Sequence, residues 1–121
     1  MKTPLNTQIG GNHYKMLPYQ PVTLATKLNF NFIQGSILKY VSRYKNKNGE
    51  QDLSKSIHFA EIGNSLQPQN YYVFGDRSSE EIHKYVHENN FAPIVENILF
   101  NVAAQRWEHV ISGVIGLLQE L

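Results

Sequence analysis

The sequence contains no cysteine, and this absence removes several kinds of chemistry at once. Without a thiol there is no disulfide, no thiolate nucleophile and no cysteine-ligated zinc site. The net charge is only +1, from 11 basic and 10 acidic residues, which argues against a protein that coats DNA or RNA. No stretch approaches the ~20 apolar residues of a membrane span, and residues 1–6 show no signal-peptide pattern. We therefore expect a cytosolic protein with no membrane partner.

The motifs of common nucleotide sites and active sites are missing as well. The sequence has no phosphate-binding GxxxxGK[ST] loop, no dinucleotide-binding GxGxxG and no serine or cysteine nucleophile motif. His83 and His87 have a spacing that can bind zinc on one helix face, but no glutamate follows His83 and no third ligand is evident. We expect them to be solvated or partly packed histidines, and we predict no catalytic residue, no metal site and no cofactor.

What the sequence does contain is apolar residues at helical spacing. With 121 residues and a hydrophobic fraction of 41%, the chain fits a single domain over 1–121 with one modest core, which an oligomer would help to complete. The pattern predicts an all-α fold, a compact bundle of about five to six short helices with an irregular N-terminal arm at 1–20. Residues 21–62 would form a helical nucleotide-binding unit, and 63–121 a region for packing and assembly. A short strand at Tyr71–Phe74 is possible from its aromatic run, but we do not predict it.

Helix boundaries follow from capping residues, prolines and breaks. The expected helices are 21–28, 32–45 after Asn31 as N-cap, one from Glu50 or Asp52 to Ile62, 79–88 after a Ser78–Glu81 capping box, one starting at Pro93, and 105–120. The expected inner stripes are Val22, Ala25 and Leu28, then Ile33, Ile37, Tyr40, Val41 and Tyr44, then Leu53, Ile57 and Ala60. Gly63 would end or bend the third helix, and Gly35 suggests a close backbone approach inside the second.

The clearest chemical pattern is Gly35-x-x-x-Lys39-x-x-x-Arg43 on the second expected helix. Residues four apart share a helix face, so this spacing predicts a basic edge beside a spot without a side chain. An arginine holds phosphate oxygens with two parallel hydrogen bonds, and a lysine adds a compact charge. Spacing alone fits an ordinary solvated helix face even better. Asp52 can stabilise the start of its helix through the helix dipole and can also pair with Arg43.

The N-terminal arm offers a second group of candidates. His13-Tyr14-Lys15 follows Gly10-Gly11, whose backbone can approach an anion closely. A histidine can hydrogen-bond a base or a phosphate, and a tyrosine can stack on a base. A flexible arm that docks one tyrosine in the core explains the same residues equally well.

These segments also carry a resemblance to a known family. His13-Tyr14, Tyr19-Gln20-Pro21, Lys39-Tyr40-x-x-Arg43-Tyr44-Lys45 and Asp52-Leu53-x-Lys55 resemble a small domain of unknown function that is widespread in phages. That domain also occurs in the nucleoside monophosphate kinase of T-odd coliphages, which lacks a P-loop and has an additional N-terminal region without a counterpart here. The resemblance covers residues 12–62 and implies a helical nucleotide-binding unit that oligomerises. It places near the ligand His13, Tyr14, Lys39, Arg43, Lys45, Asp52 and Lys55.

Together these features favour a phage protein of the host cytoplasm that sequesters a nucleotide-derived immune signal without cleaving it. A cyclic ADP-ribose isomer or a cyclic oligonucleotide would be the ligand. Lys39 and Arg43 would hold its phosphates, and Tyr14, Tyr40 or Tyr44 would stack on a base, in pockets at or near subunit interfaces of a homo-oligomer. Two alternatives stay open: a P-loop-less kinase of dTMP or dGMP, or a related nucleotide-metabolism enzyme, and a helical protein that blocks a host factor.

Overall fold

The computed structural model describes residues 3–7, 17–45, 48–66 and 76–121. These residues form a short 3-10 turn, η1 (Pro4–Asn6), and six α-helices, with no strand among them. The helices are α1 (Pro21–Lys27), α2 (Phe32–Arg43), α3 (Gly49–Leu66), α4 (Asp76–Glu88), α5 (Pro93–Ala103) and α6 (Trp107–Gln119). The predicted all-α bundle is therefore confirmed. The aromatic run at Tyr71–Phe74 lies outside the described residues.

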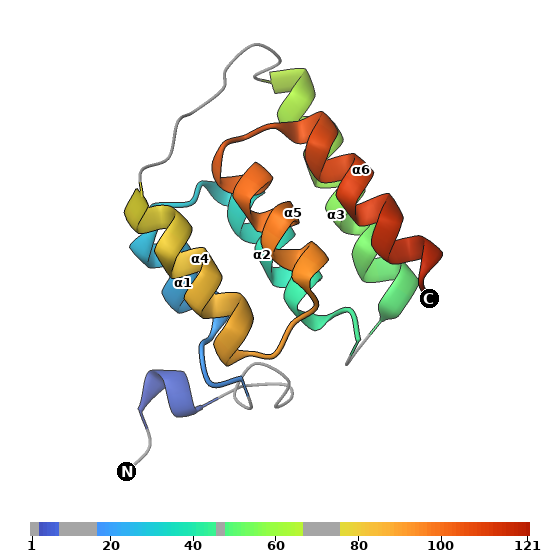
Figure 1. Cartoon of the computed structure of the whole chain (residues 1–121). Helices are drawn as coiled ribbons and strands as arrows, with labels where there is room; N and C mark the ends of the chain where they lie inside the picture. The colour runs from blue at the N-terminus through green and yellow to red at the C-terminus, as the bar shows by residue number, and fades with distance from the viewer. Residues whose placement is uncertain (1–2, 8–16, 46–47, 67–75) are drawn as a thin grey trace.

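The six helices form two layers of three (Figure 1). Within the first layer α1 packs on α2 and α2 on α3, and within the second α4 packs on α5 and α5 on α6. Across the layers α1 contacts α4, α2 contacts α5 and α3 contacts α6. The core lies between the layers, and α2 and α5 form its centre.

Local sequence explains how α1, α2 and α5 begin. Asn31 caps α2 through a reciprocal pair: its side chain accepts from Gln34 N, and the Gln34 side chain accepts from Asn31 N, both at 2.9 Å. Pro21 and Pro93 occupy the first turns of α1 and α5, where a missing N–H costs nothing. These starts agree with the sequence prediction.

Three helices end in the same way. Asn29, Asn90 and Gln105 follow α1, α4 and α5 with φ of 54°, 56° and 56°, in the left-handed region. In each case the next residue closes the turn with a backbone bond of 2.9–3.0 Å to a carbonyl five residues back: Phe30 to Ala25, Phe91 to Val86 and Arg106 to Asn101. Because Gln105 belongs to this turn, the predicted helix start at 105 is wrong, and α6 begins at Trp107.

Polar side chains join the two layers across the core. Gln34 of α2, 6% exposed, donates to the carbonyls of Val102 and Ala103 at the end of α5 (3.1 and 3.3 Å). Ser42 of α2 and Tyr85 of α4 share a buried hydrogen bond of 2.5 Å between their hydroxyls. These bonds satisfy polar groups that burial would otherwise penalise, and they fix how the layers meet.

Two of the predicted inner stripes need correction. Val22 is 56% exposed, because α1 turns Pro21 and Leu24 inward instead, with Ala25 and Leu28 packed at the edge. Ile37 and Val41 of α2 and Tyr44, which caps its end, are buried as expected, whereas Tyr40 is only half-buried. The period of the pattern was right in both helices, but the direction of the inner face was off by about one residue.

The predicted boundaries of α3 and α4 also need correction. α3 continues through Gly63 to Leu66, since Gly63 makes room for the Trp107 ring of α6 rather than breaking the helix. α4 begins at Asp76, so Ser78 lies inside the helix and the predicted Ser78–Glu81 capping box is wrong. Glu81 instead accepts a hydrogen bond from the Tyr19 hydroxyl. Gly35 has open space where a Cβ would stand, so the expected close backbone approach is absent there.

None of the helices in the described ranges combines the length and the apolar character that crossing a bilayer requires.

Candidate functional site

The packing of α3 on α2 gathers three positive side chains around one aromatic ring. Lys39 Nζ, Arg43 Cζ and Lys55 Nζ lie 4.9, 4.8 and 5.4 Å from the centre of the Tyr40 ring. Lys39 and Arg43 are one turn apart on α2, and Lys55 comes from α3. These distances are within cation–π range. We call the five residues Lys39, Tyr40, Arg43, Asp52 and Lys55 the Tyr40 cluster.

Asp52 fixes the arginine of this cluster. Its side chain is fully buried in the first turn of α3, and its Oδ1 accepts from Arg43 Nη2 at 3.2 Å. Its Oδ2 accepts from the backbone N–H of Asn48 at 3.3 Å, next to the start of α3. The pairing with Arg43, whose side chain is 13% exposed, agrees with the sequence prediction. Removing one partner of such a buried pair costs about 3–5 kcal/mol, so Asp52 holds the arginine in place.

Two phenylalanines extend the aromatic part of the site. The Phe59 ring of α3 stacks beside Tyr40, with centres 6.0 Å apart and planes at 21°, and Phe32 meets Phe59 edge-on at 6.0 Å. Phe32 is 79% exposed. Neither phenylalanine was predicted from the sequence as a site residue. The spacing of four between Lys55 and Phe59 was the signal for Phe59, since it puts both on one face of α3.

The charge balance of the Tyr40 cluster favours an anion. It holds three positive side chains and one buried carboxylate, and crowding like charges around one ring raises the local positive potential. The surface is open at Gly35, one turn before Lys39. The arrangement offers positive charge for an anion beside two aromatic rings.

Two other candidates from the sequence, Lys45 and Tyr44, have different surroundings. Lys45 lines a small cavity of about 160 Å³ with Ser42 and with Asn89–Ala92, the turn between α4 and α5. Tyr44 is buried, and burial, followed by the charge of Glu120, raises the pKa of its hydroxyl. Its ring therefore belongs to the core. His13 and Tyr14 lie outside the described residues.

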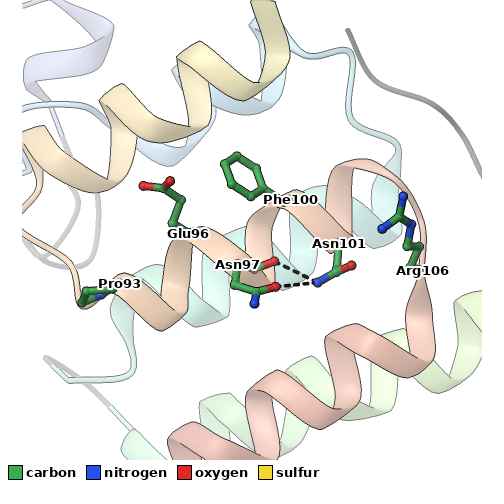
Figure 2. A pocket seen from close by; sticks show the side chains of 6 residues that line it. All are labelled: Pro93, Glu96, Asn97, Phe100, Asn101 and Arg106. Atoms are coloured by element: carbon green, nitrogen blue, oxygen red, sulfur yellow. Dashed lines mark hydrogen bonds between the residues drawn. The ribbon is translucent and has the colours of Figure 1, made fainter. Parts of the chain in front are cut away.

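Two further grooves lie elsewhere on the described surface. One of about 470 Å³ runs between the N-terminal segment, α1 and α4 and contains Lys27 and Lys84. Another of about 450 Å³ follows α5 (Figure 2). In it Asn101 donates to the backbone and side-chain oxygens of Asn97 at 3.0 and 2.8 Å, and Arg106 stands at one end. Neither gathers three cations on an aromatic ring as the Tyr40 cluster does.

Comparison with known proteins gives one match. No curated protein sequence and no solved structure matches the chain significantly. Residues 10–61 match the model of a protein family of unknown function, DUF3310. The matched range includes α1, α2, most of α3 and all five residues of the Tyr40 cluster. This part of the chain is thus similar to an uncharacterised domain.

Proposed function

We propose that the chain binds a nucleotide-derived signalling molecule at the Tyr40 cluster and sequesters it without cleavage. A cyclic ADP-ribose isomer or a cyclic oligonucleotide fits the chemistry, and the resemblance of residues 12–62 to a phage domain suggests that the result is inhibition of host anti-phage defence. The observation that carries the binding proposal is the convergence of Lys39, Arg43 and Lys55 on the Tyr40 ring, within 5.4 Å of its centre.

The phosphates of a nucleotide need positive side chains and its base needs an aromatic ring, and the Tyr40 cluster contains both. Arg43, held by Asp52, adds positive charge beside the Tyr40 ring, and Lys39 and Lys55 supply point charges for phosphate oxygens. Stacking of a base on an aromatic side chain is worth about 1–3 kcal/mol in single-stranded nucleic-acid complexes. A ring bordered by cations is therefore suited to a ligand that alternates bases and phosphates.

Sequestration is favoured over phosphoryl transfer by the state of Asp52. A kinase must position two nucleotides and a metal ion, and it needs carboxylates that are accessible for this. The carboxylate of the Tyr40 cluster is fully buried and both of its oxygens accept hydrogen bonds from the protein. It supports Arg43 and is not presented to a substrate.

The proposal is tested by incubating the full chain with cyclic ADP-ribose, a cyclic dinucleotide or dTMP and measuring free ligand in the filtrate. We expect depletion of one cyclic ligand and its recovery intact after the protein is heated. Lys39→Gln and Lys55→Gln should each weaken binding about tenfold or more, since hydrogen bonds to charged groups contribute about 1.5–3 kcal/mol. Arg43 is unsuitable for this test because its loss leaves Asp52 buried and unpaired.

Lys84→Gln on α4 is the matched control, because it removes the same charge from the groove beside α1. An equal loss of binding in this variant would move the ligand to that groove. Free ligand at its input concentration for every nucleotide would reject the proposal. Conversion of dTMP or dGMP that depends on ATP and magnesium would favour the kinase alternative, and specific capture of one host protein would favour the interaction alternative.

A further inference from the structure

The packing of α4 on α5 supplies the third ligand that the histidine pair lacks in sequence. His83 and His87 lie one turn apart on α4, with ring centres 4.0 Å apart. Glu96, in the first turn of α5, reaches His83: its Oε1 is 3.0 Å from His83 Nδ1. One ligand atom from each of the three side chains can be chosen so that all lie within 4.8 Å of one another.

The turn between the helices sets up this meeting. Asn90 reverses the chain in the left-handed conformation, and α5 begins only three residues later at Pro93. The first turn of α5 therefore lies against the last turns of α4. In Figure 2 the Glu96 carboxylate projects from α5 on the side of α4. Two rigid helices, rather than a loop, thus hold the three side chains.

We propose that His83, His87 and Glu96 form a binding site for a transition-metal ion, with Zn²⁺ as the best match. Zinc binds imidazole nitrogen and carboxylate oxygen in tetrahedral geometry at about 2.0–2.2 Å, which places ligand atoms roughly 3.3–3.5 Å apart. The pair at 3.0 Å is already close to this separation, and a pair at the upper limit of 4.8 Å must approach by roughly 1.3–1.5 Å. Rotation of the exposed His83 and His87 side chains would achieve this, with Glu96, 24% exposed, as the more fixed ligand.

Three protein ligands leave the fourth position of the metal for water or for an anion from solution. Sites of this composition are open, in contrast to closed structural sites with four protein ligands. Metal binding would also tie α4 to α5 and stabilise the folded chain by mass action. The site lies in the second layer of the bundle and outside residues 10–61, so it stands independently of ligand binding at the Tyr40 cluster.

The experiment is a zinc titration of the full chain, stripped of metal by a chelator, followed by calorimetry. We expect one Zn²⁺ per chain at this site and a melting temperature that rises with zinc. His87→Asn and Glu96→Gln should weaken binding by more than the roughly 10- to 100-fold that the loss of an outer-shell partner costs. His109→Asn, which removes an exposed histidine of α6, is the matched control and should bind zinc like the unaltered chain.

A second readout keeps the test independent of variant folding. Co²⁺ bound by two histidines and one carboxylate in tetrahedral geometry gives intense visible absorption bands, and hydrated Co²⁺ does not. Such bands in the unaltered chain, removed by one equivalent of Zn²⁺, support the site. Absence of saturable zinc binding, or an equal loss of affinity in His109→Asn and His87→Asn, would overturn it.

Discussion

At the residue scale, Tyr19 joins the segment before α1 to α4 through both its backbone and its side chain. Its hydroxyl donates to Glu81 Oε2 at 2.6 Å, and its backbone exchanges two hydrogen bonds with the Asn89 side chain, at 3.0 and 2.7 Å. The hydrogen bond from Tyr19 lowers the pKa of the Glu81 carboxyl below its usual value of 4.5, and Lys27, 3.6 Å away, acts in the same direction. The ionised carboxylate is thus favoured in the folded state.

This contact predicts a pH-dependent effect of Tyr19→Phe, which keeps the buried ring and removes the hydroxyl. Near pH 7 we expect a loss of about 1.5 kcal/mol, the lower end for hydrogen bonds to charged groups, because the Glu81 side chain is 21% exposed. A lowered folded-state pKa adds stability above pH 4.5 that is lost as pH falls through the folded value. The difference between the two proteins should therefore shrink toward pH 3 in urea unfolding.

Glu81→Gln is the control for this titration, since it removes the ionisable group while leaving the tyrosine. It should also flatten the acid side of the stability curve. A difference between Tyr19→Phe and the unaltered chain that stays constant from pH 7 to pH 3 would contradict the role of Glu81.

Residue-scale predictions from the sequence succeeded for neighbours on one helix and for opposite charges close together in the chain. The Arg43–Asp52 pair and the basic edge of Lys39 and Arg43 followed from spacing and charge. The position of Tyr40 did not follow from spacing, because its ring contacts Lys55 and Phe59 of the next helix. The contact of Glu96 with His83 was not predicted for the same reason, since it depends on how α5 packs on α4.

At the element scale, Gly63 shows how a glycine can serve packing rather than helix termination. A Cβ at Gly63 would lie 2.6 Å from Cε2 of Trp107, whose ring is 3% exposed and closely packed. Gly63→Ala gains up to about 1 kcal/mol of helix propensity, but forcing the ring away costs about 1–3 kcal/mol. We expect a net loss of stability and a lower melting temperature, measured by circular dichroism.

Gly35→Ala provides the matched comparison, because it is the same change inside another helix, with no atom within 4 Å of the new Cβ. This variant should gain up to about 1 kcal/mol from helix propensity alone. Opposite shifts in the two melting temperatures are the expected result. Shifts in the same direction would mean that the Trp107 contact does not control the response at Gly63.

Helix boundaries that depend on local sequence were predicted correctly, and those that depend on tertiary packing were not. Starts marked by Asn31, Pro21 and Pro93 were predictable, because caps and prolines act within a few residues. The end of α3 and the start of α4 were not. Gly63 was taken for a stop although a tryptophan from α6 requires it, and Ser78 with Glu81 matched a capping pattern inside a continuing helix.

At the scale of the whole molecule, the two layers are similar units in one chain. Asn29 and Asn90 end α1 and α4 in the same conformation. The number of residues between Asn29 and Asn90 also separates three pairs of buried residues at the centre of the core. These pairs are Ile37 and Ile98, Leu38 and Leu99, and Val41 and Val102. No repeat was evident from the sequence, because only the core and the turns agree.

The surfaces of the two units differ, and the Tyr40 cluster belongs to the first unit. At the same interval, Lys39, Tyr40 and Arg43 of α2 correspond to Phe100, Asn101 and Ala104. The basic face is therefore absent from the second unit, which instead carries His83, His87 and Glu96. The family match ends at residue 61, close to the boundary between the two units.

The remaining question at this scale is assembly, for which the exposed ring of Phe32 makes a specific prediction. Phe32 is 79% exposed beside Phe59 at the edge of the Tyr40 cluster, where a second subunit would close the ligand site. Burial of a phenylalanine contributes about 1.5–3 kcal/mol, so Phe32→Ser should weaken self-association about tenfold or more. Light scattering after gel filtration measures this over a range of concentrations. Leu66→Ser, which changes a residue 69% exposed at the end of α3, should leave the mass unchanged. A monomer at every concentration, or dissociation by Leu66→Ser alone, would show that the site is closed by one chain or that assembly uses another face.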